Sequence, residues 1–136
     1  MIVGALLTAL GCAASAPGPA ALDTKNEACT SCRMLVSDAH TASQIVSPGE
    51  EPLFFDDLAC LRRYRASHPL PAQAAIYVAD HRTGEWVGAA NAVYTQTRLQ
   101  TAMNGGVLAH ASAASRDQDP AARGMSVSTE SAVGTK

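Results

Sequence analysis

Short apolar segments separated by turn residues fill the middle of the chain and predict a small fold of strands and helices. Three such segments predict strands, at residues 34–36, 41–46 and 53–55. Apolar residues then recur at helical spacing directly after Asp56 and Asp57, which predicts a helix capped by one of these aspartates. The sequence His68-Pro69 ends this helix, because the residue before a proline disfavours the helical conformation.

The second half of the chain repeats this alternation with a weaker pattern. Strands are predicted at residues 74–79, 85–87 and 91–95, with a hairpin turn at 80–84. After the paired glycines Gly105 and Gly106, residues 107–115 predict a short helix. The two halves together predict an α+β fold in which two small β-β-α-β units form a degenerate tandem.

The composition of the two ends sets the expected domain boundaries. The chain has 136 residues, which is enough for one small domain. Residues 12–25 are mostly Ala, Ser, Pro and Gly and are predicted to form a flexible tether. Residues 116–136 show no periodicity and are predicted to be a disordered tail. The folded domain is therefore expected at residues 26–115.

The first residues have the pattern of an export signal. Residues 1–11 are almost wholly apolar and precede Cys12, as in a bacterial lipoprotein signal, which is cleaved before the cysteine that carries the lipids. Two features depart from that pattern: no Lys or Arg precedes the apolar run, and Leu10 stands one position later than usual. The alternative is an ordinary secretory peptide cleaved near residues 14–20. We expect an extracytoplasmic protein, anchored through Cys12 to a membrane that faces the periplasm.

Composition and charge argue against several classes of function. The formal net charge is −2 and aromatic residues make up 4% of the chain, which argues against nucleic-acid binding. No apolar run reaches the length of about 18 residues that a membrane-spanning helix needs. The sequence has no ordered Ser–His–acid pattern, no phosphate-binding loop and no His-Glu-x-x-His motif. We therefore expect a binding protein and not an enzyme.

The cysteines carry most of the information about chemistry. The chain has four of them: Cys12, Cys29, Cys32 and Cys60. If Cys12 is lipidated, three thiols remain, and three cannot all pair within one chain. Either Cys29 and Cys32 form a disulfide and Cys60 stays free, or the thiols bind a metal or take part in redox chemistry.

The segment Cys29-Thr-Ser-Cys32-Arg-Met34 favours copper among these uses. Thiolate and thioether sulfur atoms are soft ligands that select Cu(I) over hard cations. If a strand begins at Cys32, Met34 lies on the same face, so that three sulfur groups can converge. A zinc site would need a second pair of ligands, and a thioredoxin-type motif would lie between a strand and a helix. Spacing alone leaves these uses and a structural disulfide open.

Five motifs along the chain occur in an order that is found in a known family. They are Cys29-x-x-Cys32-x-Met34-x-Val36, Asp38-x-His40-x-Ala42-x-Gln44-Ile45, Phe55-Asp56-Asp57-Leu58-x-Cys60-Leu61, Tyr77-Val78-x-Asp80-x-x-Thr83-Gly84-Glu85-Trp86 and Met103-x-Gly105-Gly106. With these motifs the chain resembles the NosL family, copper lipoproteins that assist the assembly of nitrous oxide reductase. The resemblance covers residues 29–111.

This resemblance implies a fold of two β-β-α-β units and a periplasmic, lipid-anchored carrier of Cu(I). It implies that Cys29, Cys32 and Met34 bind the ion, with Met103 as a further ligand. The implied partners are apo nitrous oxide reductase, or a related cuproenzyme, and its assembly transporter complex at the membrane.

The chain also departs from the family pattern. Arg33 stands where the family usually has Gly. Ala102 and Asn104 flank Met103, where the family usually has Pro and Gly. An aromatic residue expected near His110 is replaced. These changes concern the geometry of the copper site.

The remaining candidate residues have simpler interpretations. Cys60 lies between apolar residues of the predicted helix and is interpreted as a core residue, because free cysteine is among the most buried residue types. His40 is expected to be solvated or hydrogen-bonded, and His110 is not assigned as a ligand. Two alternative functions remain open. The protein is either an extracytoplasmic thiol–disulfide redox protein that uses Cys29 and Cys32, or a lipoprotein whose cysteines only stabilise the fold.

Overall fold

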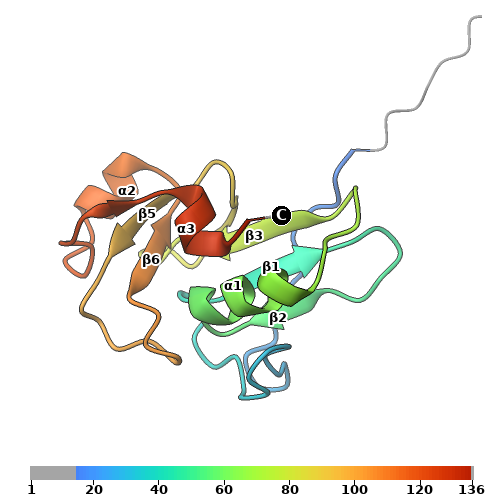
Figure 1. The fold of residues 1–136 in the computed structure, drawn as a ribbon. Helices are drawn as coiled ribbons and strands as arrows, with labels where there is room; N and C mark the ends of the chain where they lie inside the picture. Colours follow the sequence, from blue (N-terminus) through green and yellow to red (C-terminus); the bar gives the residue numbers. More distant parts are fainter. Residues whose placement is uncertain (1–14, 136) are drawn as a thin grey trace, which may run out of the picture.

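The computed structural model describes residues 15–135, which form two small antiparallel sheets and three helices (Figure 1). The mixed architecture confirms the α+β prediction. The predicted signal, residues 1–11, and the predicted lipidation site, Cys12, lie outside the described residues. In chain order the elements are β1 (Ser43–Val46), β2 (Leu53–Phe55), α1 (Leu58–Ser67), β3 (Ala75–Ala79), β4 (Trp86–Gly88), β5 (Val93–Gln96), β6 (Val107–His110), α2 (Ala113–Asp117), β7 (Ser126–Val127) and α3 (Thr129–Val133).

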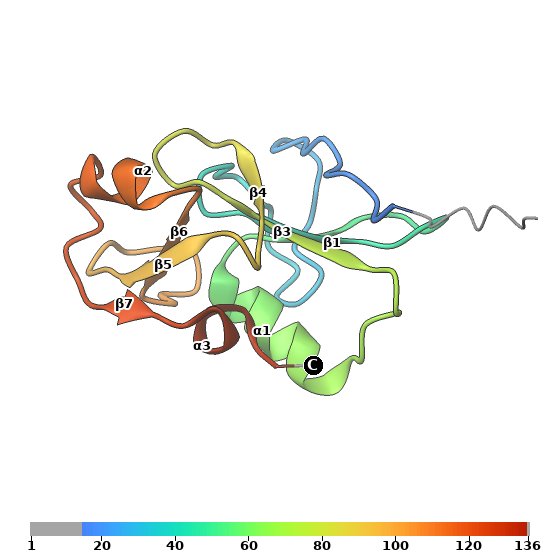
Figure 2. The same cartoon turned by 90° about the horizontal axis from the view of Figure 1, so that it is seen from above.

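The larger sheet is built from the first half of the chain. Its strands lie in the order β2-β1-β3-β4, and every neighbouring pair is antiparallel. β1 is central, and all four of its residues are buried. α1 packs against β1 and β2 on one face of the sheet (Figure 2). β2 leads into α1 through Asp56 and Asp57, so the strand and the helix meet at these two carboxylates.

The smaller sheet has the same topology as the first three strands of the larger one. Its strands lie in the order β6-β5-β7, again antiparallel, and α2 contacts β5 and β6. β5, β6, α2 and β7 follow one another as β1, β2, α1 and β3 do, and in both units the first strand lies in the middle. This confirms the tandem β-β-α-β prediction. The strand β4 and the helix α3 are additions to the repeat.

The prediction of a helix over residues 107–115 is wrong. Residues 107–110 form β6, which pairs along its whole length with β5. Helix α2 begins only after Ser112, whose hydroxyl accepts a hydrogen bond from the backbone N–H of Ser115. A short apolar run does not distinguish strand from helix, and here the pairing with β5 decides. The strand predicted at 34–36 is reduced to a single bridge between Leu35 and Ala28.

The prediction of a disordered tail over residues 116–136 is wrong for the described part of that segment. β7 pairs with β5, and α3 packs on α1, where Ala132 and Val133 become buried. The Arg65 guanidinium of α1 donates hydrogen bonds to the carbonyl groups of Val133, at 2.8 Å, and Gly134. These long-range contacts order a segment that has too few apolar residues to show a period of its own. The folded part therefore extends beyond its predicted end and includes the last strand of the second unit.

The described part of the predicted tether, residues 15–25, lies against the larger sheet. The Ala20 N–H donates to the side-chain oxygen of Gln44 at 2.8 Å, and the Gln44 amide donates to the Ala20 carbonyl at 3.1 Å. The Tyr77 hydroxyl donates to the Pro17 carbonyl at 2.7 Å. Gln44 is fully buried, so its amide needs these partners. Among the described residues, no helix has the length and apolar character required to cross a membrane.

The hydrophobic core lies between α1 and the larger sheet and continues to α3. Its largest fully buried apolar side chains are those of Val36, Ile45, Phe55, Leu61 and Val78. Cys29 and Cys60 belong to the same core, and neither exposes any surface. Two of the cysteines are therefore held rigidly by the packing around them.

Candidate metal centre

Three cysteines and one carboxylate meet where β2 joins α1. Cys29, Cys32, Cys60 and Asp56 each offer a donor atom, and these four atoms lie within 4.8 Å of one another. All three cysteines are free thiols. The predicted pair Cys29 and Cys32 is therefore brought together, and no disulfide joins the two.

The loop that carries Cys29 and Cys32 is closed by its own backbone. The Cys29 N–H donates to the Met34 carbonyl at 2.7 Å, and the Arg33 N–H donates to the Cys29 carbonyl at 2.9 Å. The Thr30 N–H donates to the carbonyl of Phe54 in β2 at 2.8 Å. This last bond fastens the loop to the strand that ends just before Asp56.

Cys60 reaches the cluster from the first turn of α1. It is fully buried, which confirms its interpretation as a core residue, but its thiol also faces Cys29 and Asp56. Sequence analysis therefore missed a member of the cluster. The signal that could have revealed it is the motif Phe55-Asp56-Asp57-Leu58-x-Cys60. This motif places one more thiol close to the Asp56 carboxylate at the start of a helix.

The cluster combines thiols with an incompletely paired carboxylate. The Cys32 thiol donates to Asp56 Oδ2 at 3.3 Å, whereas Asp56 Oδ1 is buried and has no hydrogen-bond partner among the described residues. Burial raises the pKa of the Cys32 and Cys60 thiols, and the neighbouring Asp56 raises both further. The raised pKa values favour the protonated form of these two thiols in the metal-free protein. A bound cation would replace these protons and would give the buried carboxylate an opposite charge nearby.

The NosL family profile matches residues 19–123, which is most of the chain. The chain belongs to the NosL family. No curated relative and no solved structure matches it. NosL proteins are extracytoplasmic, copper-binding accessory proteins, and the cluster of three thiols is compatible with a copper site.

Two positions at which NosL proteins usually have Gly adopt a left-handed backbone in this chain. Arg33 has φ 68° and Asn104 has φ 55°. This region costs most residues about 1–2 kcal/mol, whereas asparagine tolerates it better. Both loops therefore keep a conformation that glycine favours, and Arg33 stores strain next to the thiol cluster.

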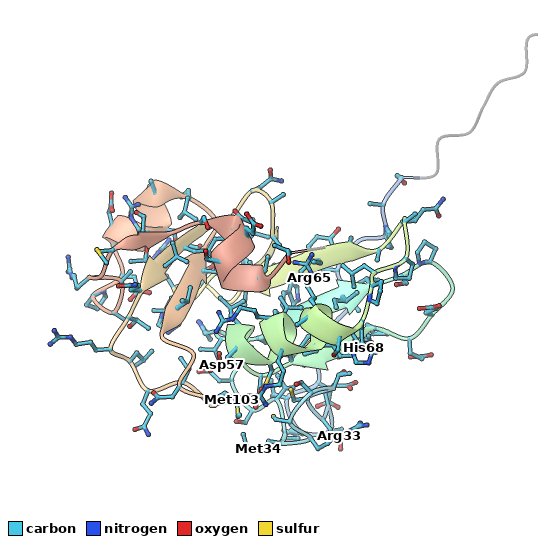
Figure 3. The ribbon with its side chains drawn as sticks, viewed as in Figure 1. Arg33, Met34, Asp57, Arg65, His68 and Met103 are labelled. Atoms are coloured by element: carbon cyan, nitrogen blue, oxygen red, sulfur yellow. The ribbon has the colours of Figure 1, made fainter. Side chains whose placement is uncertain are left out.

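The two predicted methionine ligands differ in exposure. The side chain of Met34 is 45% exposed, whereas Met103 is half-buried and packs against the core. Figure 3 shows both on the same side of the molecule, near Asp57 at the start of α1. The role of these two thioethers as ligands stays a prediction.

Asp57 connects the start of α1 to the loop that carries Met103. Its Oδ1 caps the helix by accepting from the Ala59 N–H at 2.8 Å. Its Oδ2 accepts from the Thr101 hydroxyl and from the backbone N–H groups of Met103, at 3.0 Å, and Gly105, at 3.3 Å. The capping prediction for this aspartate is confirmed, and the same side chain also fixes the position of Met103.

The two histidines singled out in the sequence stand apart from the thiol cluster. His40 is exposed, and its Nδ1–H donates to the carbonyl of His81 at 2.7 Å. His110 is fully buried, with Nε2 2.8 Å from a carboxylate oxygen of Asp119. The hydrogen-bonded role expected for His40 is confirmed, and the burial of His110 was not predicted.

Proposed function

We propose that this NosL protein binds one Cu(I) ion and delivers it for the maturation of nitrous oxide reductase or a related cuproenzyme. The observation that carries the proposal is the convergence of three free thiols, from Cys29, Cys32 and Cys60, in a chain of a copper-binding family. Thiolates are soft ligands and favour Cu(I) over harder cations. The protein acts as a carrier, so its site has to release the ion as well as bind it.

The thiolates of Cys29, Cys32 and Cys60 hold the ion, and the thioethers of Met34 and Met103 assist its exchange. A gradient of exposure supports this division: Cys29 and Cys60 are fully buried, Cys32 is half-buried, and Met34 is 45% exposed. A neutral thioether is a weaker ligand than a thiolate. An ion that moves outward through Cys32 and Met34 is therefore held less tightly where a partner's ligands can reach it. The thiols release protons when copper binds and recover them when it leaves.

The carrier is held at a membrane that faces the periplasm by lipids on Cys12. A single acyl chain anchors a protein only marginally, whereas the several chains of a mature lipoprotein anchor it firmly. The recipient is the apo-reductase or its assembly transporter complex at the same membrane, and anchoring raises the local concentration of the carrier near that complex.

An anaerobic titration of the reduced full chain with Cu(I), against a chromogenic chelator, tests the ligand set. A Cys12→Ser background removes the predicted lipidation thiol. We expect one equivalent to be bound, with binding lost in Cys29→Ser/Cys32→Ser and weakened by more than about tenfold in Cys60→Ser, an equivalent of about 1.4 kcal/mol. Cys60→Ala provides a second variant that buries no hydroxyl group.

Replacement of the methionines completes this test. Met34→Ala and Met103→Ala are expected to weaken binding and to change the rate of transfer to the chelator. Met125→Ala is the matched control, because Met125 is 70% exposed and precedes β7 in the other unit. If the Cys29→Ser/Cys32→Ser variant binds Cu(I) as tightly as its parent, the ligand assignment is wrong. Transfer of copper from the loaded chain to the apo-reductase in the presence of its assembly complex tests the recipient.

The thiol–disulfide alternative is the weaker candidate. A redox nucleophile needs an accessible thiol with a lowered pKa. Here Cys29 is fully buried, and burial raises the pKa of Cys32. If the reduced chain binds no Cu(I) and Cys29 and Cys32 instead cycle as a disulfide with a measurable reduction potential, the redox function replaces the one proposed.

A further inference from the structure

A second group of metal-ligating side chains lies in the other half of the molecule. His81 comes from the turn after β3, His110 ends β6, and Asp119 follows α2. His81 Nδ1 lies 2.5 Å and His110 Nε2 2.8 Å from the same oxygen, Asp119 Oδ2. The three donor atoms lie within 4.8 Å of one another, and none belongs to the thiol cluster.

The carboxylate of Asp119 is buried without a permanently charged partner. Its side chain is 5% exposed, and among the described ion pairs only the two histidines contact it. Its Oδ1 accepts a hydrogen bond from the Ala121 N–H at 2.8 Å, and its Oδ2 faces both imidazoles. A buried carboxylate is stabilised by a cation that binds directly to it.

His110 is the residue whose environment is hardest to explain as simple packing. Its side chain exposes no surface. Its Nδ1 is buried and has no hydrogen-bond partner among the described residues. A buried polar atom without a partner destabilises a fold. The contact of the other ring nitrogen, Nε2, with Asp119 Oδ2 at 2.8 Å therefore has to account for an imidazole in this place.

We propose that His81, His110 and Asp119 bind a divalent transition-metal ion such as Zn²⁺, at a site separate from the Cu(I) thiols. Two imidazole nitrogens and one carboxylate oxygen suit Zn²⁺ and other ions of borderline hardness. The two clusters differ in their donors: the first offers three soft thiols beside Asp56, which favour Cu(I), whereas the second offers only nitrogen and oxygen.

Binding requires a small rearrangement at the three donors. Around a tetrahedral Zn²⁺ with bonds of about 2.0–2.1 Å the donor atoms stand about 3.3 Å apart, so the present contacts have to widen by less than about 1 Å. When these two nitrogens bind the metal, the proton on His81 Nδ1 moves to Nε2 of the same ring, and the proton on His110 Nε2 moves to Nδ1. Both rings stay neutral. His81 is 16% exposed and lies on a turn, so its ring can move and its second nitrogen can reach water. His110 Nδ1 lacks a partner both before and after this change.

Zinc titration of the full chain tests the site. The Cys12→Ser chain is first loaded with one equivalent of Cu(I), so that its thiols are occupied, and is then titrated with Zn²⁺ against a chromogenic zinc chelator. We expect one equivalent of Zn²⁺ to be bound, and a rise in the melting temperature when it binds. Asp119→Asn and His110→Phe are expected to lose both effects.

The controls separate metal binding from structural damage. His68→Gln removes an exposed histidine outside the cluster and is expected to bind Zn²⁺ as the parent does. Circular dichroism checks the fold of each variant. If His110→Phe does not fold, His81→Gln on the partly exposed turn tests the same site. A parent chain that takes up no Zn²⁺, or an Asp119→Asn variant that binds it equally well, would overturn the proposal.

The two proposals can fail independently. Asp119→Asn is expected to bind Cu(I) with unchanged affinity, because the thiol cluster is intact. If the parent binds no Cu(I), the proposed copper function fails, and the zinc titration is repeated in a background with Cys29, Cys32 and Cys60 replaced by Ser. Zinc bound in that background would support the second site without the first.

Discussion

Replacement of Asp57 by Asn is expected to destabilise both the start of α1 and the loop that carries Met103. The carboxylate accepts four hydrogen bonds, one from the Ala59 N–H and three from the segment 101–105. The asparagine has the same shape but only one acceptor oxygen. If that oxygen still accepts the bond from the Ala59 N–H, the side-chain NH₂ group of the asparagine faces the donors of the loop. An NH₂ group cannot accept their hydrogen bonds.

The magnitude follows from the donors that lose their acceptor. The Thr101 hydroxyl can rotate toward another acceptor, and the Gly105 N–H also donates to Thr101 Oγ1 at 3.1 Å, whereas the Met103 N–H is fixed by the backbone on Asp57. Leaving the Met103 N–H unpaired costs about 1–3 kcal/mol, so Asp57→Asn is expected to lower the free energy of unfolding by about 2 kcal/mol. For a domain of this size that corresponds to a fall in melting temperature of about 7 °C.

The pH dependence of the same variant gives an independent check. Burial would raise the pKa of Asp57, but the bonds from Thr101, Ala59, Met103 and Gly105 lower it below its ordinary value. A carboxylate whose pKa is lower in the folded protein than in the unfolded chain stabilises the fold fully above its unfolded-state pKa, near 4. This stabilisation is lost as the pH falls through the lower pKa of the folded state. The difference in unfolding free energy between parent and Asp57→Asn should therefore shrink in acid and be constant near neutral pH.

Urea unfolding of the full chain from acid to neutral pH measures this difference. Asp38→Asn serves as the control, because Asp38 is exposed and its side chain caps only a local turn. A loss below about 1 kcal/mol in Asp57→Asn, or a difference that does not change with pH, would refute the idea that this carboxylate ties the loop to the helix.

Three further predictions concern other parts of the fold. Arg33→Gly removes the steric cost of a left-handed backbone at this position. After the entropy that glycine loses on folding is subtracted, the change should stabilise the chain by about 0.5–1 kcal/mol. A lower midpoint of unfolding in urea would contradict this. Gly105→Ala brings a Cβ to 2.2 Å from Asp57 Oδ1 and should cost more than about 2 kcal/mol, whereas Gly18→Ala, with open space around it, should change little on thermal unfolding. Arg65→Gln breaks the bonds to the carbonyls of residues 133 and 134 and should speed amide exchange across α3, with Arg63→Gln, exposed on the same helix, as the unaffected control.

Local sequence patterns identified the elements that carry strong signals of their own. The helix at residues 58–67 combines apolar periodicity with an aspartate cap and a terminal His-Pro, and the structure has it with the capping residue Asp57. The strands near 43–46, 53–55 and 75–79 were recognised because each is an apolar run bounded by turn residues. These signals act within a few residues of chain, so no knowledge of the rest of the fold is needed to see them.

The second unit was harder to predict because its elements are short and depend on distant partners. β6 is four residues long and could be recognised as a strand only through its pairing with β5. β7 and α3 contain few apolar residues, and their order comes from β5 and from α1, including Arg65, about 70 positions earlier in the chain. A tail that looks disordered by composition is thus part of the core.

For the site, the sequence by itself determined the chemistry of the donors, and the tertiary structure decided which of them meet. Cys29 and Cys32 were identified as a pair because they are close in sequence and soft in character. Cys60 joins them only because β2 and α1 bring its thiol back to the loop. The buried group of His81, His110 and Asp119 gives no local signal, since its members come from three elements separated by 29 and 9 residues. Donor chemistry is a property of single residues and is visible in a sequence, whereas the meeting of distant donors is a property of packing, which folding alone creates.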